Sequence, residues 1–506
     1  MQHESVHQGV EEKWMILASV ACGTFMATLD SSIVNVALPS ITLAFKTTLS
    51  HSRWVVIAYL FSITGLLLFF GKLADVIGRK VVFNAGFLIF TLGCLMCALS
   101  GTIDQLIMAR GLQGFGAAMI MANGPAIITA AFPTNERGKA LGTLAMVVSA
   151  GLAMGPPLGG MLVNDFGWPS IFFVNIPFGL LGAYLVHKNV PTLLGMSGSI
   201  DDLAKLAREN QLPRLTRVKI YLGKLQYFDW LGVIMWMFIQ FGYSLAIDRE
   251  NALGLAGPLQ KMVSFGSGGL LLLFLLWEWS VNDPVLDLSL FRSRLFLASN
   301  VAGLFNFIAV SAITLLLPFY LQNVREFKPQ QVGLIMTTIP LTIFIVAPIS
   351  GRLSDIYDAR VLATLGMTLL CLAMGLLALP NSGLSDPNPT SLIFDLILVG
   401  AGIGLFQAPN NNSIMGAVQR SHLGVASAML ATVRNFGLVT GAAMSTTLLM
   451  HYYRYYGAQS SLRDVQASSE NFIIAMRHTF MALAAICSLG IFTSMTRGPR
   501  PDAAKN

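Results

Sequence analysis

The residue best placed to do chemistry is Asp30, a carboxylate inside an apolar stretch that runs from Trp14 to Leu38. The stretch is long enough to cross a bilayer, since about 20 apolar residues span the hydrocarbon core. A charge at that depth costs about 2.5 kcal/mol or more on insertion scales. Asp30 is therefore a candidate proton carrier. The alternative is a carboxylate that only fixes the packing of neighbouring helices.

A second charge, Arg110, is predicted to reach the same depth from another helix. With a rise of about 1.5 Å per residue, Asp30 lies about 24 Å from the cytoplasmic end of its helix, and Arg110 lies about 9 Å from the outer end of its own. In a core of about 30 Å these depths nearly coincide. If the helices are neighbours, Arg110 tunes the proton affinity of Asp30. Otherwise it is a packing residue bonded to carbonyls.

Composition places the elements that carry these charges in lipid. The chain has 506 residues, 54% hydrophobic and 11% charged, whereas a soluble domain is about 25% charged. The N-terminal segment has more acid than base and no small-residue cleavage site, so the first span is expected to remain. The net charge of +7 is scattered through short connectors, which indicates topology signals and not nucleic-acid binding.

Apolar runs predict an all-α polytopic membrane protein with fourteen spans. The expected spans are 15–38, 54–71, 81–100, 104–131, 140–163, 171–187, 230–248, 262–281, 296–321, 331–350, 361–380, 391–409, 424–450 and 478–495. Most Lys and Arg then fall on one side, which places both termini in the cytoplasm of a cell (inner) membrane protein. Residues 199–212 form either an amphipathic helix or part of a flexible linker.

An internal repeat organises these spans into halves. GKLADVIGRK at Gly71 to Lys80 recurs as GRLSDIYDAR at Gly351 to Arg360, an offset of 280 residues. Paired six-helix halves around a midplane site are typical of transporters whose halves rock against each other. The predicted domains are an N-terminal bundle 1–190, a cytoplasmic linker 191–228, two inserted transmembrane helices 229–284 and a C-terminal bundle 285–506.

The repeated loop has the residue types of a gate. Glycine permits close helix approach, and a carboxylate can pair with bases or with the N-terminus of a facing helix. A solvated turn that only sets topology is the alternative, and the repetition favours the gate. The predicted cytoplasmic gate consists of Gly71, Asp75, Gly78, Arg79, Asp355 and Arg360.

The fifth span carries Gly151, Gly155 and Gly159 on one helical face, with Pro156 beside them. Small residues every four positions permit backbone contact with another helix, and proline favours a kink. Ordinary close packing explains the glycines. Together with a kink at an interface between the halves, they predict a seal against leak.

Apolar, polarizable side chains with a few amides suit amphipathic organic molecules, although any single Phe or Met more often faces lipid or a neighbouring helix. The candidate cavity residues are Phe25, Met26, Asn35, Phe61, Met119, Asn123, Phe305, Asn306, Gln407, Asn410, Asn411 and Arg434.

Other chemistry is weakly represented. Cys94 and Cys97 lie one turn apart, but no nearby His completes a metal site, so packing is expected. The sequence has no phosphate-binding loop with a soluble domain after it, which argues against ATP hydrolysis as the energy source. We expect no metal and no cofactor, and uphill transport would be driven by an ion gradient.

These motifs resemble the major facilitator superfamily, and within it the fourteen-spanning drug:proton antiporters of the QacA and EmrB type. The resemblance covers nearly the whole chain. Its motifs are LDSSIVNVALP at 29–39, GKLADVIGRK at 71–80, LIMARGLQGFGAA at 106–118, the glycines of span five with Pro156, then Trp168, Phe172, Asn175, Pro177, Pro284, Phe291, Arg434 and Gly437.

The resemblance implies that Asp30 takes part in coupling to the proton gradient, that Arg110 supports proton exchange, and that Asp75 with Arg79 belongs to the gate. The loop departs from the family pattern at Val76, and its second copy departs at Asp358.

The expected function is proton-coupled export of hydrophobic or amphipathic compounds, and no enzymatic activity is expected. The expected partners are a small amphipathic substrate, the lipid bilayer and, in a double-membraned bacterium, a periplasmic adaptor. A dedicated lipid or metabolite exporter or flippase is the first alternative. A receptor or assembly protein that does not transport is a remote one.

Overall fold

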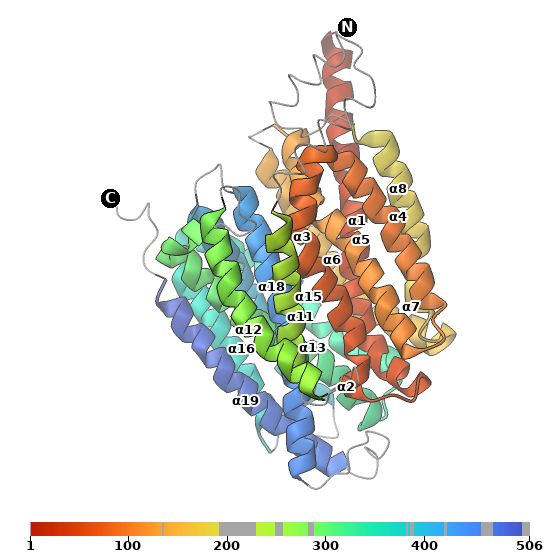
Figure 1. Ribbon diagram of the computed structural model, residues 1–506, viewed down its shortest axis with the longest axis vertical. Coiled ribbons are helices and arrows are strands. Elements are labelled where there is room, and N and C mark those ends of the chain that lie inside the picture. Colours follow the sequence, from red (N-terminus) through yellow and green to blue (C-terminus); the bar gives the residue numbers. More distant parts are fainter. Residues whose placement is uncertain are drawn as a thin grey trace.

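The structure is a computed structural model that describes residues 2–133, 136–191, 229–247, 257–281, 288–380, 383–384, 389–418, 423–456 and 469–497. Every regular element in these ranges is a helix (Figure 1). Helices are expected for such apolar runs, because a helix satisfies its own backbone polar groups where no water is present. The proposed amphipathic segment 199–212 lies outside the described residues.

The N-terminal helices correspond to the first six expected spans. Their bounds are α1 Gln2–Ala44, α2 Leu49–Ser52, α3 Trp54–Ile77, α4 Arg79–Ala98, α5 Ile103–Ala131, α6 Arg137–Phe166, α7 Ser170–Phe173 and α8 Asn175–Asn189. Gly78 joins α3 to α4 with φ of 102°, a left-handed conformation that glycine adopts without steric cost.

The inserted helices and the C-terminal helices follow in the expected order. Their bounds are α11 Trp230–Ile247, α12 Gly257–Ser280, η1 Leu288–Arg292, α13 Arg294–Asn323, α14 Pro329–Met336, α15 Thr338–Ile356, α16 Ala359–Ala378, α17 Pro389–Gly416, α18 Leu423–Tyr455 and α19 Ser469–Met495.

Eleven candidate spans among the described residues are long and apolar enough to cross a membrane, counting α7 with α8 and α14 with α15 as single spans. Several helices extend beyond the predicted spans, which is a correction to their boundaries. The last span was expected to begin at residue 478, but α19 begins at Ser469. Its first turns carry Glu470 and Arg477, so a search for apolar residues finds only the later part of the helix.

The two halves repeat the same packing. In the N-terminal half α4 packs on α5, α3 on α5 and α1 on α6. The corresponding C-terminal pairs, α16 with α17, α15 with α17 and α13 with α18, are also in contact. The helices that correspond under the offset of 280 residues therefore occupy equivalent positions, as the repeated loop predicts.

The halves meet at the end of the bundle opposite the turns at Gly78 and Tyr357, which is the predicted outer end. Arg53 Nη1 donates to the Ala443 carbonyl at 3.1 Å. Gln322 Nε2 donates to the Val36 carbonyl at 2.8 Å. These contacts join α1 to α13 and the start of α3 to α18.

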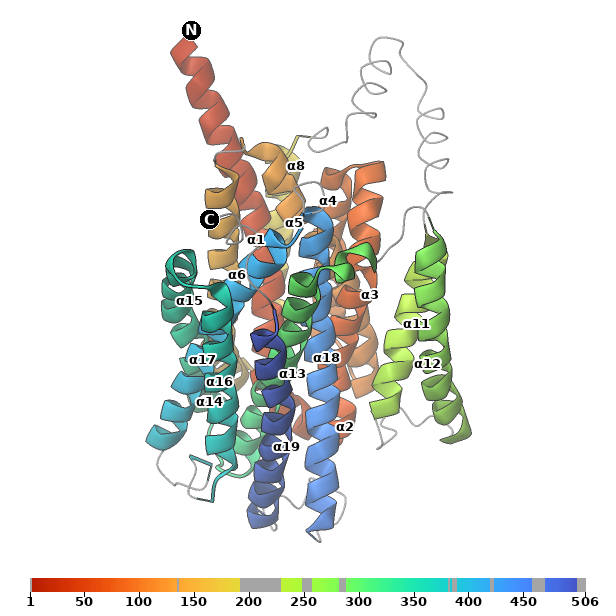
Figure 2. The same cartoon turned by 90° about the vertical axis from the view of Figure 1, so that its left-hand side faces the viewer.

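The inserted helices form a hairpin at one side of the bundle, next to α3 and α18 (Figure 2). Only α11 of the pair packs substantially on both halves, through α3 and α18. Large apolar side chains of α12 are exposed, among them Phe265 at 82% and Leu276 at 68%. α12 is therefore the outer, lipid-facing member of the hairpin.

Candidate functional site

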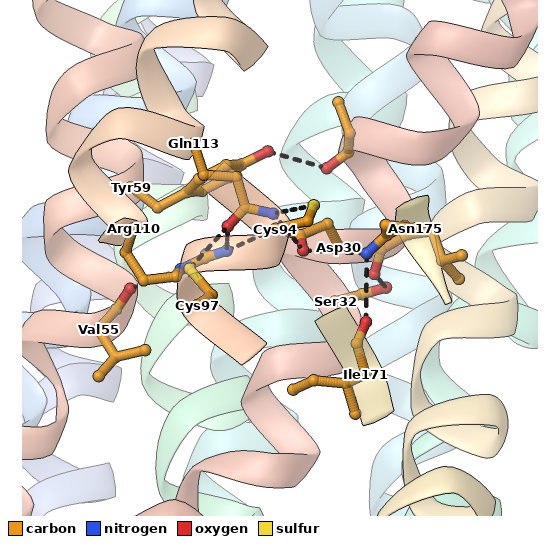
Figure 3. Close-up of polar contacts among 12 residues, drawn as sticks. Asp30, Ser32, Val55, Tyr59, Cys94, Cys97, Arg110, Gln113, Ile171 and Asn175 are labelled. Atoms are coloured by element: carbon orange, nitrogen blue, oxygen red, sulfur yellow. Dashed lines mark hydrogen bonds and ion pairs between the residues drawn. The ribbon is translucent and has the colours of Figure 1, made fainter. Parts of the chain in front are cut away.

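Asp30 lies in the middle of the N-terminal half and is 0% exposed. Its Oδ2 accepts a hydrogen bond from Arg110 Nη1 at 2.6 Å, and its Oδ1 accepts from Gln113 Nε2 at 2.8 Å and from Asn175 Nδ2 at 3.2 Å (Figure 3). The predicted proximity of Asp30 and Arg110 is thus found in the structure. A buried carboxylate with a cation and two amide donors has the partners that burial of a charge requires.

Arg110 is held from several directions. Its Nε donates to the Val55 carbonyl at 2.9 Å, and Nη1 also donates to Gln113 Oε1 at 2.5 Å. The guanidinium carbon lies 4.1 Å from the centroid of the Tyr59 ring, a cation–π distance. The Tyr59 hydroxyl in turn donates to the Ala27 carbonyl of α1 at 3.1 Å. This network fixes the guanidinium beside the carboxylate from α1, α3 and α5.

Three members of the network were given no role from the sequence. Gln113 follows Arg110 by three positions, so it lies on the same face of α5, which is the signal that could have identified it. Asn175 begins α8, and its place beside Asp30 depends on how α8 packs against α1. Tyr59 carried no signal of its own, because aromatic residues are common in membrane spans.

The cysteines near this network lie against Gln113. Gln113 Nε2 lies 3.0 Å from Cys94 Sγ, and Cys97 Sγ lies 3.7 Å from Gln113 Oε1. The described residues contain no group of three or more His, Cys, Asp and Glu that could hold a metal ion. Both thiols pack against the amide that holds Asp30.

The structure describes the side chains of some of the predicted gate residues. Arg79 Nη1 donates to the Ala126 carbonyl of its own half at 2.9 Å, and Arg360 is exposed. A Cβ added to Gly71 would meet nothing within 4 Å. The side chains of Asp75 and Asp355 lie outside the described residues.

The glycine face of α6 corrects one expectation. A Cβ added to Gly155 would clash with Ser32, and one added to Gly159 would lie 2.7 Å from Ile33 Cγ1. The face therefore packs on α1 of the same half and not on the other half. The neighbouring Gly160 provides the contact between halves, because a Cβ there would lie 3.0 Å from Gln330 Cα of α14.

The candidate cavity residues fall into two groups. Partly exposed are Phe25, Asn35, Phe61, Phe305, Gln407, Asn411 and Arg434. Buried are Met26, Met119, Asn123, Asn306 and Asn410. Met26 belongs to the main hydrophobic core, and Asn123 donates to the Met119 carbonyl of its own helix at 2.8 Å, so packing explains these two residues.

Several buried amides of the C-terminal half have side-chain oxygens without hydrogen-bond partners among the described residues. The Oδ1 atoms of Asn300, Asn306 and Asn410 have none, and these residues are 3% or less exposed. Asn410 lies across from α13, since its Nδ2 would be 3.5 Å from a Cβ on Gly303. An unpaired buried amide costs about 1–3 kcal/mol, so these side chains are candidates for binding a ligand or water.

Three further carboxylates near the ends of spans, Asp229, Glu278 and Asp395, are buried. Glu278 is 3% exposed and Asp395 is 6% exposed, whereas the side chain of Asp104 is 68% exposed and lies 2.9 Å from His51. Asp229 is 6% exposed, accepts from Gly232 N at the start of α11 and accepts from Trp277 Nε1 at 2.8 Å.

Comparison with known families and proteins agrees with this architecture. The sequence profile of the Major Facilitator Superfamily matches residues 20–299 and 295–506. The riboflavin transporter RibZ of Clostridioides difficile (strain 630) is 32% identical over 486 residues, which cover 96% of this chain and 98% of that protein. The multidrug resistance protein Stp of Mycobacterium tuberculosis (strain ATCC 25618 / H37Rv) is 30% identical over 438 residues, covering 86% and 75%.

A solved structure shares the fold at low sequence identity. The crystal structure of a bacterial homologue of the human lysosomal transporter Spinster, in an inward-facing and unoccupied conformation, matches with a TM-score of 0.67 and 12% identity. The match covers 96% of this chain and 97% of that one.

Proposed function

This chain belongs to the major facilitator superfamily, and from that premise we propose that it is a proton-coupled antiporter that exports hydrophobic or amphipathic compounds by alternating access. Membership makes it a multi-pass membrane transporter of small molecules and not an enzyme. The observation that carries the finer proposal is the fully buried Asp30, whose carboxylate contacts a guanidinium and two amides.

Such a carboxylate is suited to carry a proton. Protonation neutralises Asp30 and removes the charge that balances Arg110, so the network around the pair must rearrange when the proton binds or leaves. Both α1 and α5, which carry the pair, pack on other helices of the N-terminal half. Proton binding is thereby linked to the arrangement of that half.

The contacts between the halves support an inward-facing conformation. At the predicted outer end they include Arg53 with Ala443 and Gln322 with Val36. At the predicted cytoplasmic end, a Cβ added to Gly71 would meet no atom within 4 Å, and Arg79 donates a hydrogen bond within its own half. We assign Gly71, Gly78, Arg79 and Arg360, with Asp75 and Asp355, to a gate that closes in the opposite conformation.

The fourteen-span topology with both termini in the cytoplasm is part of the proposal. It counts α3, α11 and α18 as spans besides the eleven candidates that meet the length and hydropathy criteria. A Cys placed near Asn251 should react with an impermeant thiol reagent from outside, and one near Glu209 only from the cytoplasm. Labelling of both positions from the same side would exclude the topology.

A second candidate is favoured by the similarity to RibZ over nearly the full length of both proteins. In that case the chain is a dedicated transporter of one flavin-like metabolite. Proteoliposomes with an imposed proton gradient distinguish the two. Efflux of several unrelated dyes supports the multidrug exporter, whereas movement of riboflavin alone supports the dedicated transporter. Absence of proton-dependent flux for every compound would contradict both candidates.

A further inference from the structure

The inserted helix α11 carries a buried glutamine with no partner. Gln240 is 1% exposed, and neither its Nε2 nor its Oε1 has a hydrogen-bond partner. Desolvating both ends of an amide without replacing their hydrogen bonds costs about 1–3 kcal/mol for each group. If α11 only packed between the lipid and the bundle, an apolar residue in place of Gln240 would cost no stability.

The neighbours of Gln240 fix the direction in which it points. On one side of it, Trp236 and Tyr243 contact Phe436 of α18, with ring centroids 6.2 Å and 5.2 Å apart. On the other side, Met237 lies against Gly65, and Phe241 lies 6.1 Å from Phe61 of α3.

Successive residues of an α-helix are rotated by about 100°, which places Gln240 on the arc between these two sides. The amide therefore faces the seam where α3 of the N-terminal half meets α18 of the C-terminal half.

The seam lies at the level of the central charges. Gln240 is level with the segment of α3 between Phe61 and Gly65, about one helical turn from Tyr59, whose ring covers Arg110. On α18, Phe436 lies two residues from Arg434. The amide thus approaches the midplane site from the side, between the helices of opposite halves.

We propose that Gln240 is a specificity-determining residue of the substrate passage, supplied by the inserted hairpin through the seam between α3 and α18. It rests on the proposed transport function. A primary amide offers donors and an acceptor side by side, and the rings of Phe61, Trp236, Tyr243 and Phe436 surround its approach. This combination fits a flat heteroaromatic molecule with a neighbouring N–H and carbonyl, such as a cyclic imide.

The test compares two probes on the full chain in lipid nanodiscs. Riboflavin is flat and has an imide edge, whereas tetraphenylphosphonium is aromatic and has no hydrogen-bonding edge. Gln240→Met keeps an unbranched side chain of similar length. It should weaken riboflavin binding about fivefold, the change expected from the loss of one hydrogen bond. Tetraphenylphosphonium binding should stay within about twofold of wild type, as expected for loss of a polar contact that it does not make.

Ser244→Ala is the matched control. Ser244 is 1% exposed on the same face of α11, but its hydroxyl already donates to the main-chain carbonyl oxygen of Gln240 at 2.9 Å. It should leave both probes unaffected. Equal weakening of both probes by Gln240→Met, or no change in either, overturns the proposal.

A second measurement needs no substrate. A Cys at position 240 should react with a small charged thiol reagent in membrane vesicles under a proton gradient, read by peptide mass spectrometry that separates it from the five native cysteines. A Cys in place of the lipid-exposed Leu272 should not react. An unreactive position 240 contradicts the assignment. Failure of the wild type to bind or move either probe instead counts against the proposed function.

Discussion

The two halves differ in how their buried polar side chains are paired. In the N-terminal half, every buried side-chain polar atom of Asp30, Arg110 and Gln113 has a partner, whereas the amide oxygen of Asn175 beside them has none among the described residues. In the C-terminal half, the amide oxygens of Asn306 and Asn410 are as deeply buried and have none. The N-terminal half thus holds a fully paired Asp30–Arg110 ion pair with one unpaired amide oxygen beside it, and the C-terminal half holds unpaired amide oxygens on α13 and α17. We infer a division of labour, with proton binding in the first and ligand binding in the second.

The largest effect on stability and on proton-driven efflux is expected for Asp30→Asn. Removing the carboxylate leaves Arg110 as an uncompensated buried charge, so thermal unfolding should reveal a loss of about 3–5 kcal/mol. Proton-driven efflux from proteoliposomes should fall at least 100-fold, since Asn cannot carry a proton. Exchange driven only by a substrate gradient should survive. Proton-driven efflux at the wild-type rate would refute the assignment of Asp30.

A double variant separates stability from coupling. Asp30→Asn with Arg110→Gln removes both charges, so much of the lost stability should return. Proton-driven efflux should remain absent. Recovery of coupling together with stability would mean that the pair is structural only.

The second prediction concerns the rigidity of the N-terminal half. Gly155→Leu inserts a side chain where α6 touches Ser32 of α1, and overpacking there should cost about 1–3 kcal/mol and lower transport about 30-fold. Gly160→Leu is the matched variant, because it meets α14 of the other half. It should lower transport with little loss of stability. Equal stability losses for both variants would contradict this separation.

The sequence predicted similar depths for Asp30 and Arg110, because depth in a bilayer can be counted along each helix; that α1 and α5 are neighbours came from the structure. The sequence did not predict Gln113 or Asn175 as partners, since which faces meet depends on the packing of α5 and α8 against α1. The same limit explains the glycines of α6. Their spacing predicts a close helix contact, but it does not say that α1 of the same half, and not the other half, is the neighbour.

The pairing state of the buried amides cannot be read from the sequence. Asn306 and Asn410 were selected as polar residues in apolar spans, which is a property of the sequence. That their oxygens lack partners, and that Gln240 faces a seam between halves, depends on the three-dimensional arrangement. The apolar runs of the sequence identify the inserted hairpin only as two additional spans, because α12 is apolar almost throughout.

The third prediction exchanges one amide in each half. Gln113→Leu removes hydrogen bonds to charged groups, each worth about 1.5–3 kcal/mol, and should lower both stability and proton-driven efflux, the latter about tenfold. Asn410→Leu removes an amide whose oxygen is unpaired, so stability should be unchanged or slightly higher. It should weaken substrate binding a few-fold. A large loss of stability for Asn410→Leu would remove the contrast between the halves.

The smallest expected effect concerns substrate charge. Arg434 is partly exposed on α18 and forms no ion pair within the described residues, while the carboxylate of Asp30 is engaged by Arg110. The site therefore has an uncompensated positive charge, and protonation of Asp30 increases it. At an effective dielectric constant of about 20, a second positive charge on a ligand about 15 Å away costs about 1 kcal/mol, or about fivefold in affinity.

Matched monocationic and dicationic dyes that compete for the protein at fixed pH test this bias. The monocation should bind about fivefold more tightly, and Arg434→Gln should bring the two affinities together. Arg434→Lys keeps the charge and should keep the difference. Tighter binding of the dication to the wild type would show that Arg434 does not face the ligand, and would leave the unpaired amides as the feature of the C-terminal half that distinguishes substrates.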